Sequence, residues 1–173
     1  LVAMEINAAL PCGETPADTE DYEGFYHLVS MSGDVACAKL HYIVRDHDAD
    51  KFAARLETLK EISKQMNLKW GFGTVKLTID EQYRNMAEII EDGNMHLIEN
   101  AKKACAAADV TPLILPIRGG TDGARLSFMG LPCPNLGTGG HGYHGPFEHI
   151  TAEGMDKAVD VMIELVKLYA EMK

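Results

Sequence analysis

Apolar and polar residues alternate in two runs near the start of the chain. Residues 24–32 and 35–45 have an alternating, partly β-branched character, and Gly33-Asp34 separates the two runs. Two such runs around a short glycine-containing turn are typical of an antiparallel hairpin. The acidic stretch 11–23, rich in turn-forming residues, is predicted to be a loop.

A helical pattern follows the hairpin. Asp46 or Asp48 is predicted to cap a helix whose apolar positions recur at three- and four-residue spacing, namely Phe52, Leu56, Leu59, Ile62 and Met66. Residues 70–80 alternate again and predict a third strand. Strand, strand, helix and strand form most of a βαββαβ unit. Residues 1–10 are predicted to be the tail of the first helix of that unit, whose first strand is missing.

A different order of elements is predicted after residue 86. The alanine-rich residues 95–108 and the capped residues 151–170 predict helices, while the apolar runs 112–117 and 133–139 predict buried strands. The last helix is predicted to bury a stripe formed by Val159, Ile163, Val166 and Ala170. The predicted fold class is α/β: residues 1–85 form a truncated ferredoxin-like α+β unit, and residues 86–173 form part of an open α/β sheet.

Composition narrows the choice of partners and compartment. The formal net charge of −10 argues against nucleic acid and anionic membranes as partners, because both select basic surfaces. The sequence has no apolar run long enough to span a membrane. The four cysteines lack CxxC spacing and are predicted to be buried free thiols of a cytoplasmic protein.

The first ten residues have no initiating Met and no capping residue. A helix that begins in its own middle suggests a chain cut from a longer protein, which agrees with the missing strand of the βαββαβ unit.

The segment 118–148 combines many glycines with histidines, arginines and acids, a mixture that packing alone does not require. His144 in its glycine-rich setting is the best candidate for a zinc ligand, and a histidine hydrogen-bonded within a loop is the alternative. His141 and His149 are predicted to be surface or supporting groups, and His27 and His41 to be structural residues on strands.

A second candidate group lies at the start of the same segment. Arg118 could bind a peptide carboxylate, or form a salt bridge with Asp122 or Glu148. Gly119, Gly120 and Thr121 could offer backbone N–H groups and a hydroxyl to a substrate, or simply form a tight turn capped by Asp122.

The strings RGGTDGARLSFMGLPCPN and TGGHGYHGPFE resemble the C-terminal signature of the peptidase T family, the tripeptide aminopeptidases of the M20 metallopeptidases. EGFYHLVSMSG and KLHYIVRDHD resemble the same family. The resemblance covers essentially the whole chain. It implies a hydrolase with an α/β catalytic domain, to which residues 86–173 correspond, and an inserted lid and dimerisation domain, to which residues 1–85 correspond.

The resemblance also implies the chemistry. Two zinc ions bridged by an aspartate and a water would activate that water to attack the first peptide bond of a tripeptide, with a glutamate as general base. His144 falls on the last zinc ligand, in the HGxxE string, and Arg118, Gly119, Gly120 and Thr121 fall on the substrate-binding loop. A cytoplasmic homodimer formed through the lid is implied for the whole enzyme.

The family's other zinc ligands and its general base have no counterpart in this sequence. The chain is therefore expected to be a C-terminal fragment that contains no complete catalytic set and is inactive alone. A non-catalytic peptide-binding or assembly module derived from the same family is the alternative. Another activity of the M20 family, such as a carboxypeptidase or deacylase, is a third possibility.

Overall fold

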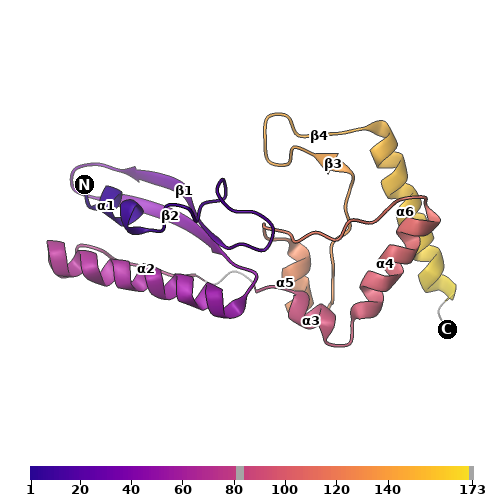
Figure 1. Cartoon of the computed structure of the whole chain (residues 1–173), viewed down its shortest axis with the longest axis horizontal. Helices are drawn as coiled ribbons and strands as arrows, with labels where there is room; N and C mark the ends of the chain where they lie inside the picture. The colour runs from indigo at the N-terminus through magenta and orange to yellow at the C-terminus, as the bar shows by residue number, and fades with distance from the viewer. Residues whose placement is uncertain (81–83, 172–173) are drawn as a thin grey trace. The chain divides into compact units, whose positions relative to one another are not determined.

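The computed structural model describes residues 1–80 and 84–171 (Figure 1). The chain divides into two compact units. Unit 1 consists of Leu1–Glu81 with Pro116–Arg118, and unit 2 consists of Gln82–Leu115 with Gly119–Lys173. Each unit is described separately below.

Unit 1 contains the predicted hairpin and helix. Its elements are α1 (Val2–Ala9), β1 (Phe25–Gly33), β2 (Ala38–Arg45) and α2 (Ala49–Trp70). The strands pair antiparallel, from Phe25 opposite Arg45 to Gly33 opposite Ala38, with one irregularity between Leu28 and Ser30. The hairpin and both helices are confirmed.

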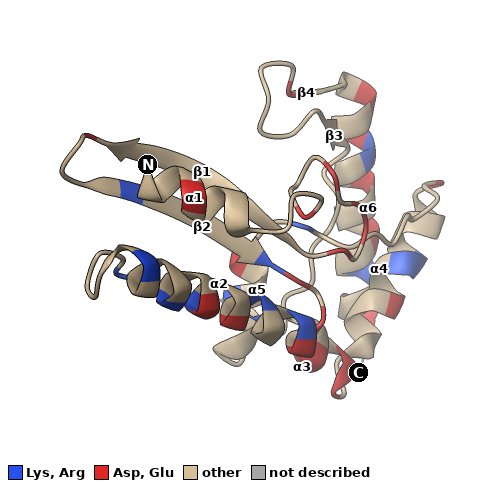
Figure 2. Ribbon diagram, turned by 60° about the vertical axis from the view of Figure 1, so that its left-hand side comes forward, with Lys and Arg blue, Asp and Glu red and all other residues tan. Residues whose placement is uncertain are grey.

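The cap of α2 is also confirmed. The side chain of Asp48 accepts a hydrogen bond from the backbone N–H of Lys51 at 2.9 Å. Figure 2 shows Lys and Arg interspersed with Asp and Glu along the rest of α2. This mixture includes exposed pairs at three-residue spacing, such as Lys60 with Glu57. Leu59 and Ile62 are the buried residues of α2 and lie on its inward face.

The α1 helix contacts both the β1–β2 hairpin and α2. Asn7 accepts a hydrogen bond from the hydroxyl of Tyr42 on β2 at 2.8 Å. The carboxylate of Glu5 pairs with Lys69 at 2.7 Å and accepts from the indole of Trp70 at 3.0 Å. The hydrogen bonds from Lys69 and Trp70 lower the pKa of Glu5 below its ordinary value.

The strand predicted over residues 70–80 is wrong. The α2 helix continues to Trp70, and residues 71–80, all of which the structure describes, form no strand. The side-chain amide of Asn67 exchanges two hydrogen bonds of 2.9 Å with the backbone of Val75. An alternating pattern becomes a strand only beside another strand, and here the backbone partner of Val75 is a side chain.

Unit 2 is mainly helical. Its elements are α3 (Ala87–Glu91), α4 (Met95–Ala107), α5 (Asp122–Phe128), β3 (Gly140–His141), β4 (His149–Ile150) and α6 (Ala152–Glu171). The helices predicted over 95–108 and 151–170 are confirmed as α4 and α6, which pack against each other (Figure 1). The core of this pair is formed by Ala104, Ala108 and Val161, with Cys105, Val110, Leu165 and Leu168 packed against it.

The two strands predicted in unit 2 are not formed. Residues 112–117 and 133–139 have no regular secondary structure and pair with no strand of the described chain. Leu113, Ile114 and Leu115 are consequently 80%, 65% and 68% exposed. A strand buried on both faces needs neighbours on both sides, which these residues do not find within the described chain.

The buried stripe predicted for α6 is wrong as well. Val159, Ile163, Val166 and Ala170 are exposed, whereas Ala158, Val161, Leu165 and Leu168 face inward. The helix carries two apolar stripes side by side, so the periodicity alone could not identify the stripe that contacts α4.

The prediction for the cysteines is half correct. All four are free thiols, but Cys12 and Cys37 are exposed, and Cys105 and Cys133 are partly exposed. Among the described residues, no helix is long and apolar enough to cross a membrane.

Candidate functional site

The first part of the candidate site is the turn that leads into α5. Thr121 caps this helix, since its hydroxyl accepts a hydrogen bond from the backbone N–H of Ala124 at 3.4 Å. The cap is therefore Thr121 and not Asp122, which is already the first helical residue. The side-chain amide of Asn135 also donates to the Thr121 hydroxyl at 3.3 Å. The tight-turn interpretation is therefore right about the turn into the helix and wrong about its cap.

Gly119 is not required by that turn. A Cβ atom built on Gly119 meets nothing within 4 Å, and the φ angle of Gly119 lies outside the left-handed region that favours glycine. Neither steric crowding nor backbone conformation within the described chain demands glycine at this position. The backbone of Gly119 is open to the approach of another molecule.

A buried serine holds α5 against the segment that follows it. Ser127 is 2% exposed. Its hydroxyl donates to the carbonyl of Gly123 at 2.7 Å and accepts from the backbone N–H of Cys133 at 2.9 Å. A Cβ atom at Gly123 would lie 2.4 Å from the carbonyl oxygen of Cys133, so only glycine permits this approach. Sequence reasoning missed Ser127, although the small residues of GGTDGARLS were a signal of close packing.

Replacing Ser127 with alanine is expected to destabilise unit 2 by about 1–3 kcal/mol, because the backbone N–H of Cys133 would lose its acceptor, the buried Ser127 hydroxyl. Thermal unfolding followed by circular dichroism measures the change. The matched control is Ser63→Ala on α2, outside unit 2. A Ser127→Ala protein as stable as this control would show that the hydrogen bond does not contribute to the stability of unit 2.

Arg118 belongs to unit 1, where it organises the loop that precedes β1. Its guanidinium donates to the carbonyl and the hydroxyl of Thr19 and, at 3.5 Å, to the carbonyl of Glu23. The guanidinium also lies 5.0 Å from the ring centroid of Phe25. The Nε–H group is buried and has no hydrogen-bond partner among the described residues. The structure therefore gives Arg118 a scaffold role in unit 1 and leaves one donor unsatisfied.

His144 lies in unit 2, in the loop between β3 and β4. Its φ angle is +62°, in a region that non-glycine residues adopt uncommonly. The backbone N–H of His144 donates to the carboxylate of Glu148 at 3.1 Å. The two ends of the HGxxE string therefore contact each other, and Glu148 stabilises the turn that presents His144. The side chain of His144 is exposed.

Two further histidines flank this loop. His141 on β3 and His149 on β4 are opposite each other, with stacked rings whose centroids are 5.5 Å apart. Nδ1 of His149 lies 2.7 Å from the carbonyl oxygen of Phe147. Both side chains are exposed, which agrees with the first of the two predicted roles, that of a surface group. His27 and His41 lie on β1 and β2, as predicted.

Within the part of the chain that the structure describes, no three His, Cys, Asp or Glu side chains are close enough to hold a metal ion together. His144 can contribute one imidazole, whereas a zinc site in a protein needs three or four ligands. The described residues do not by themselves fit a zinc ion.

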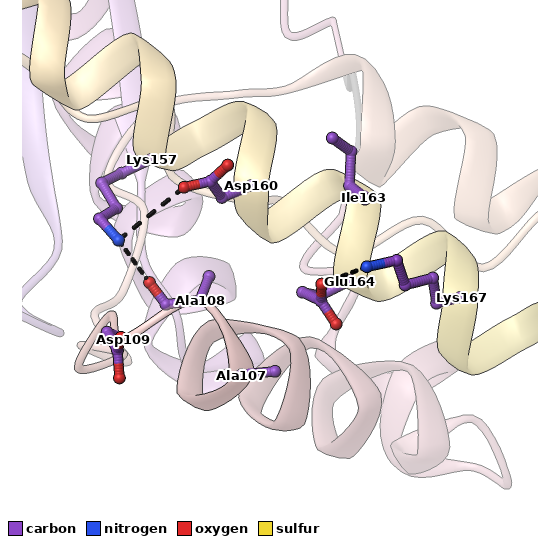
Figure 3. A pocket seen from close by; sticks show the side chains of 8 residues that line it. All are labelled: Ala107, Ala108, Asp109, Lys157, Asp160, Ile163, Glu164 and Lys167. Carbon is purple, nitrogen blue, oxygen red and sulfur yellow. Dashed lines mark hydrogen bonds and ion pairs between the residues drawn. The ribbon is translucent and has the colours of Figure 1, made fainter.

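A shallow depression on unit 2 is less promising. It lies between the end of α4 and the polar side of α6 (Figure 3). Lys157 reaches across it and donates to the carbonyl of Ala108 at 2.8 Å, so this lysine caps α4. Lys167 pairs with Glu164 at 2.7 Å. Both lysines of the depression are thus bound to a neighbouring carboxylate or to a helix end.

Comparison with known proteins shows close relatives along the whole chain. Peptidase T from Desulfitobacterium hafniense (strain DSM 10664 / DCB-2) is 52% identical over 171 residues, which cover 99% of this chain and 42% of the relative. Peptidase T from Clostridium perfringens (strain ATCC 13124) is 50% identical over 171 residues, with the same coverage. Peptidase T from Aeromonas hydrophila is 53% identical over 167 residues, which cover 96% of this chain and 41% of the relative. No protein-family model matches the chain.

Solved structures show the same fold. A tripeptidase from Staphylococcus aureus subsp. aureus Mu50 superposes on 99% of this chain with a TM-score of 0.72 and 15% sequence identity, over 45% of its own length. The aminopeptidase PepT from Bacillus cereus ATCC 10987 covers 98% of this chain with a TM-score of 0.65 and 21% identity, again over 45% of its length. These structures confirm the mixed α and β class. The resemblance to the peptidase T family is confirmed too: this chain is similar to peptidase T along 99% of its length, and it spans 42% of the relatives it matches.

Proposed function

We propose that this chain is the C-terminal part of a zinc-dependent tripeptide aminopeptidase of the M20 type, which removes the N-terminal residue of tripeptides. The observation that carries the proposal is the identity of 52% to a peptidase T over 99% of the chain. The tripeptidase and the aminopeptidase that share its fold agree with this assignment.

His144 is proposed as one ligand of a site for two zinc ions. Its exposed side chain, its left-handed backbone and the hydrogen bond from its N–H to Glu148 support a presented imidazole. The remaining ligands and the general base would come from the part of a peptidase T polypeptide that this chain does not span. We accordingly propose that the chain has no peptidase activity alone.

Arg118, Gly119, Gly120 and Thr121 are proposed to bind the peptide. The open face of Gly119 allows a substrate to approach the backbone closely. The guanidinium of Arg118 is a cation with which a peptide carboxylate could pair. The hydrogen bonds of Arg118 to Thr19 and Glu23 would hold the guanidinium in place for that contact.

The proposed whole enzyme is a cytoplasmic homodimer whose subunits associate through the lid, residues 1–85. Its partner molecule is a tripeptide, and neither nucleic acid nor a membrane is proposed. The net charge of −10 is consistent with that choice.

A non-catalytic peptide-binding or assembly module is the second candidate. The absence of a three-ligand metal cluster among the described residues favours it for the chain in isolation. The two candidates differ in one observable. An enzyme fragment regains turnover when the rest of a peptidase T polypeptide is supplied, whereas a binding module does not.

That difference defines the experiment. In a chimera, this chain replaces the 52% identical stretch of the Desulfitobacterium hafniense peptidase T, and the rest of that relative is kept. We expect the chimera to hydrolyse an unblocked tripeptide in the presence of zinc and to lose activity with a chelator. We expect the chain alone to show no turnover under either condition. A folded chimera without peptidase activity would refute the enzyme assignment.

Substituting Gly119 with alanine separates binding from folding. Since a Cβ atom at Gly119 meets nothing within 4 Å, we expect the melting temperature of the isolated chain to stay within about 1 °C. In the chimera, the added methyl group should raise KM for tripeptides roughly tenfold by blocking the approach to the backbone. The control is Gly13→Ala, which is also open but lies outside the proposed site. An equal KM for the two variants would remove Gly119 from the peptide site.

A further inference from the structure

The hairpin of β3 and β4 carries two histidines directly opposite each other. His141 and His149 form one of its Cα pairs, and the hairpin leads into α6 (Figure 1). Side chains directly opposite in an antiparallel pair have Cβ atoms about 4.5–5.5 Å apart. The two imidazole rings accordingly stack, with centroids 5.5 Å apart and an angle of 28° between their planes. Since both side chains are exposed, the hairpin presents two neighbouring imidazoles to solvent.

A hydrogen bond determines which ring nitrogen of His149 can bind a metal. Nδ1 lies 2.7 Å from the carbonyl oxygen of Phe147. A carbonyl oxygen only accepts hydrogen bonds, so Nδ1 carries the proton and Nε2 of the neutral ring carries the lone pair. The same oxygen would lie 2.9 Å from a Cβ atom on Gly142, so it packs closely on the backbone across the loop. Histidines that bind metals almost always donate their other ring N–H in this way, to a carbonyl, a carboxylate or water.

The spacing of the two rings allows them to share one ion. Two nitrogen ligands of one ion, each about 2 Å from it, lie roughly 3–4 Å apart. Because both rings are exposed, rotation about their side-chain torsions can bring one nitrogen of each ring to that separation. No third His, Cys, Asp or Glu side chain among the described residues joins them in a metal-binding group. An ion held here would therefore have two imidazole ligands and water in its other positions.

We propose that His141 and His149 form a chelating site for a divalent nickel or copper ion. Imidazole is a good ligand of both metals, which stand near the top of the affinity order of divalent first-row ions and accept tetragonal sites. The bound ion would join β3 to β4 and so fix both ends of the loop that carries His144. Two protein ligands hold an ion more weakly than the three or four of a zinc site, so we expect this ion to be lost during purification.

This site is separate from the zinc site proposed above, because neither histidine is one of the proposed zinc ligands. The inference also stands without any peptidase activity, since it concerns metal binding by this chain alone. Failure of one proposal therefore leaves the other intact.

Titration of the chain with Ni²⁺, followed by isothermal calorimetry, tests the site. Ni²⁺ is the probe because the exposed thiols of Cys12 and Cys37 would reduce Cu²⁺. Phenylalanine keeps an aromatic ring in the pair but has no lone pair, so His141→Phe and His149→Phe should each weaken nickel binding at least tenfold. The double variant should be little weaker than either single variant, because one imidazole alone has already lost the chelate. The matched control, His96→Phe, removes an exposed histidine of α4 and should leave the affinity unchanged.

Nuclear magnetic resonance of the unaltered chain gives an answer that does not depend on the folding of a variant. A small amount of paramagnetic Ni²⁺ should broaden the ring signals of His141 and His149 together, before those of the other histidines. Broadening of only one of the two rings, or an unchanged affinity in either phenylalanine variant, overturns the proposal. An equally large loss of affinity in His144→Asn would place the ion at the proposed zinc ligand and overturn it as well.

Discussion

Replacement of His144 by alanine is expected to reduce tripeptide hydrolysis by the chimera about 10³-fold or more and to lower its zinc content. Removing a residue that only hydrogen-bonds to a metal ligand already lowers metal affinity or activity about 10–100-fold. Removing a ligand itself should therefore lower them more. The imidazole is exposed on a turn that Glu148 stabilises. Metal content is measured by elemental analysis of the purified protein, together with steady-state kinetics.

Two further variants separate ligation from folding. Asparagine tolerates the left-handed backbone of His144, whose φ is +62°, so His144→Asn should keep the loop intact and still lose zinc. His141→Ala removes an exposed imidazole of the same hairpin and should leave zinc content unchanged. A His144→Asn chimera with full zinc content and normal turnover would refute the assignment of His144 as a ligand.

Glu148→Ala should reduce zinc binding less than His144→Asn and more than His141→Ala. It removes the acceptor for the N–H of His144 but no proposed ligand, so we expect zinc affinity to fall about 10–100-fold. A pronounced loss of zinc in His144→Asn and a partial loss in Glu148→Ala would distinguish ligation from positioning.

Local signals in the sequence were sufficient for four of the helices, α1, α2, α4 and α6, and for the β1–β2 hairpin, but not for α3 and α5. The cap at Asp48, the spacing of Leu59 and Ile62, and the turn at Gly33 depend on residues a few positions apart, and the structure contains all three. The resemblance of RGGTDG and HGxxE to one family could also be identified from the sequence, because ordered strings of that length are specific.

The errors have a common physical origin. A strand forms only if a distant segment supplies its hydrogen-bond partners, and residues 112–117 and 133–139 find no such strand in the described chain. The same reason explains the wrong stripe on α6, since the sequence shows two apolar stripes but not which neighbour is present. The contacts of Arg118 could not be predicted for the same reason, because its hydrogen-bond partner Thr19 lies 99 positions away in the sequence.

Replacement of Arg55 by methionine is expected to destabilise unit 1 by about 3–5 kcal/mol. The side chain of Asp46 is 1% exposed and pairs with Nε of Arg55 at 2.8 Å, and the same guanidinium binds Glu14. Burial lowers the pKa of Arg55, but the hydrogen bonds to Asp46 and Glu14 together raise it by more, so the net pKa lies above the ordinary value. Methionine keeps much of the volume of the side chain but leaves the buried carboxylate of Asp46 without its cation.

The surroundings offer Asp46 little room to adjust. A Cβ atom on Gly24 would lie 2.1 Å from an oxygen of Asp46, so the backbone at Gly24 already closes over the carboxylate. The guanidinium of Arg55 also lies 5.2 Å from the ring centroid of Tyr26, a core residue of unit 1. The destabilisation should therefore affect the packing of the hairpin on α2 and not a surface contact alone.

Urea unfolding followed by circular dichroism measures this effect. The control is Lys60→Met on the same helix, whose ion pair with Glu57 is exposed and should contribute less than about 0.5 kcal/mol. Adding Asp46→Asn to Arg55→Met removes the unpaired charge, so we expect the double variant to recover part of the lost stability. If Arg55→Met proves no more destabilising than Lys60→Met, the cluster of Glu14, Asp46 and Arg55 does not hold unit 1 together.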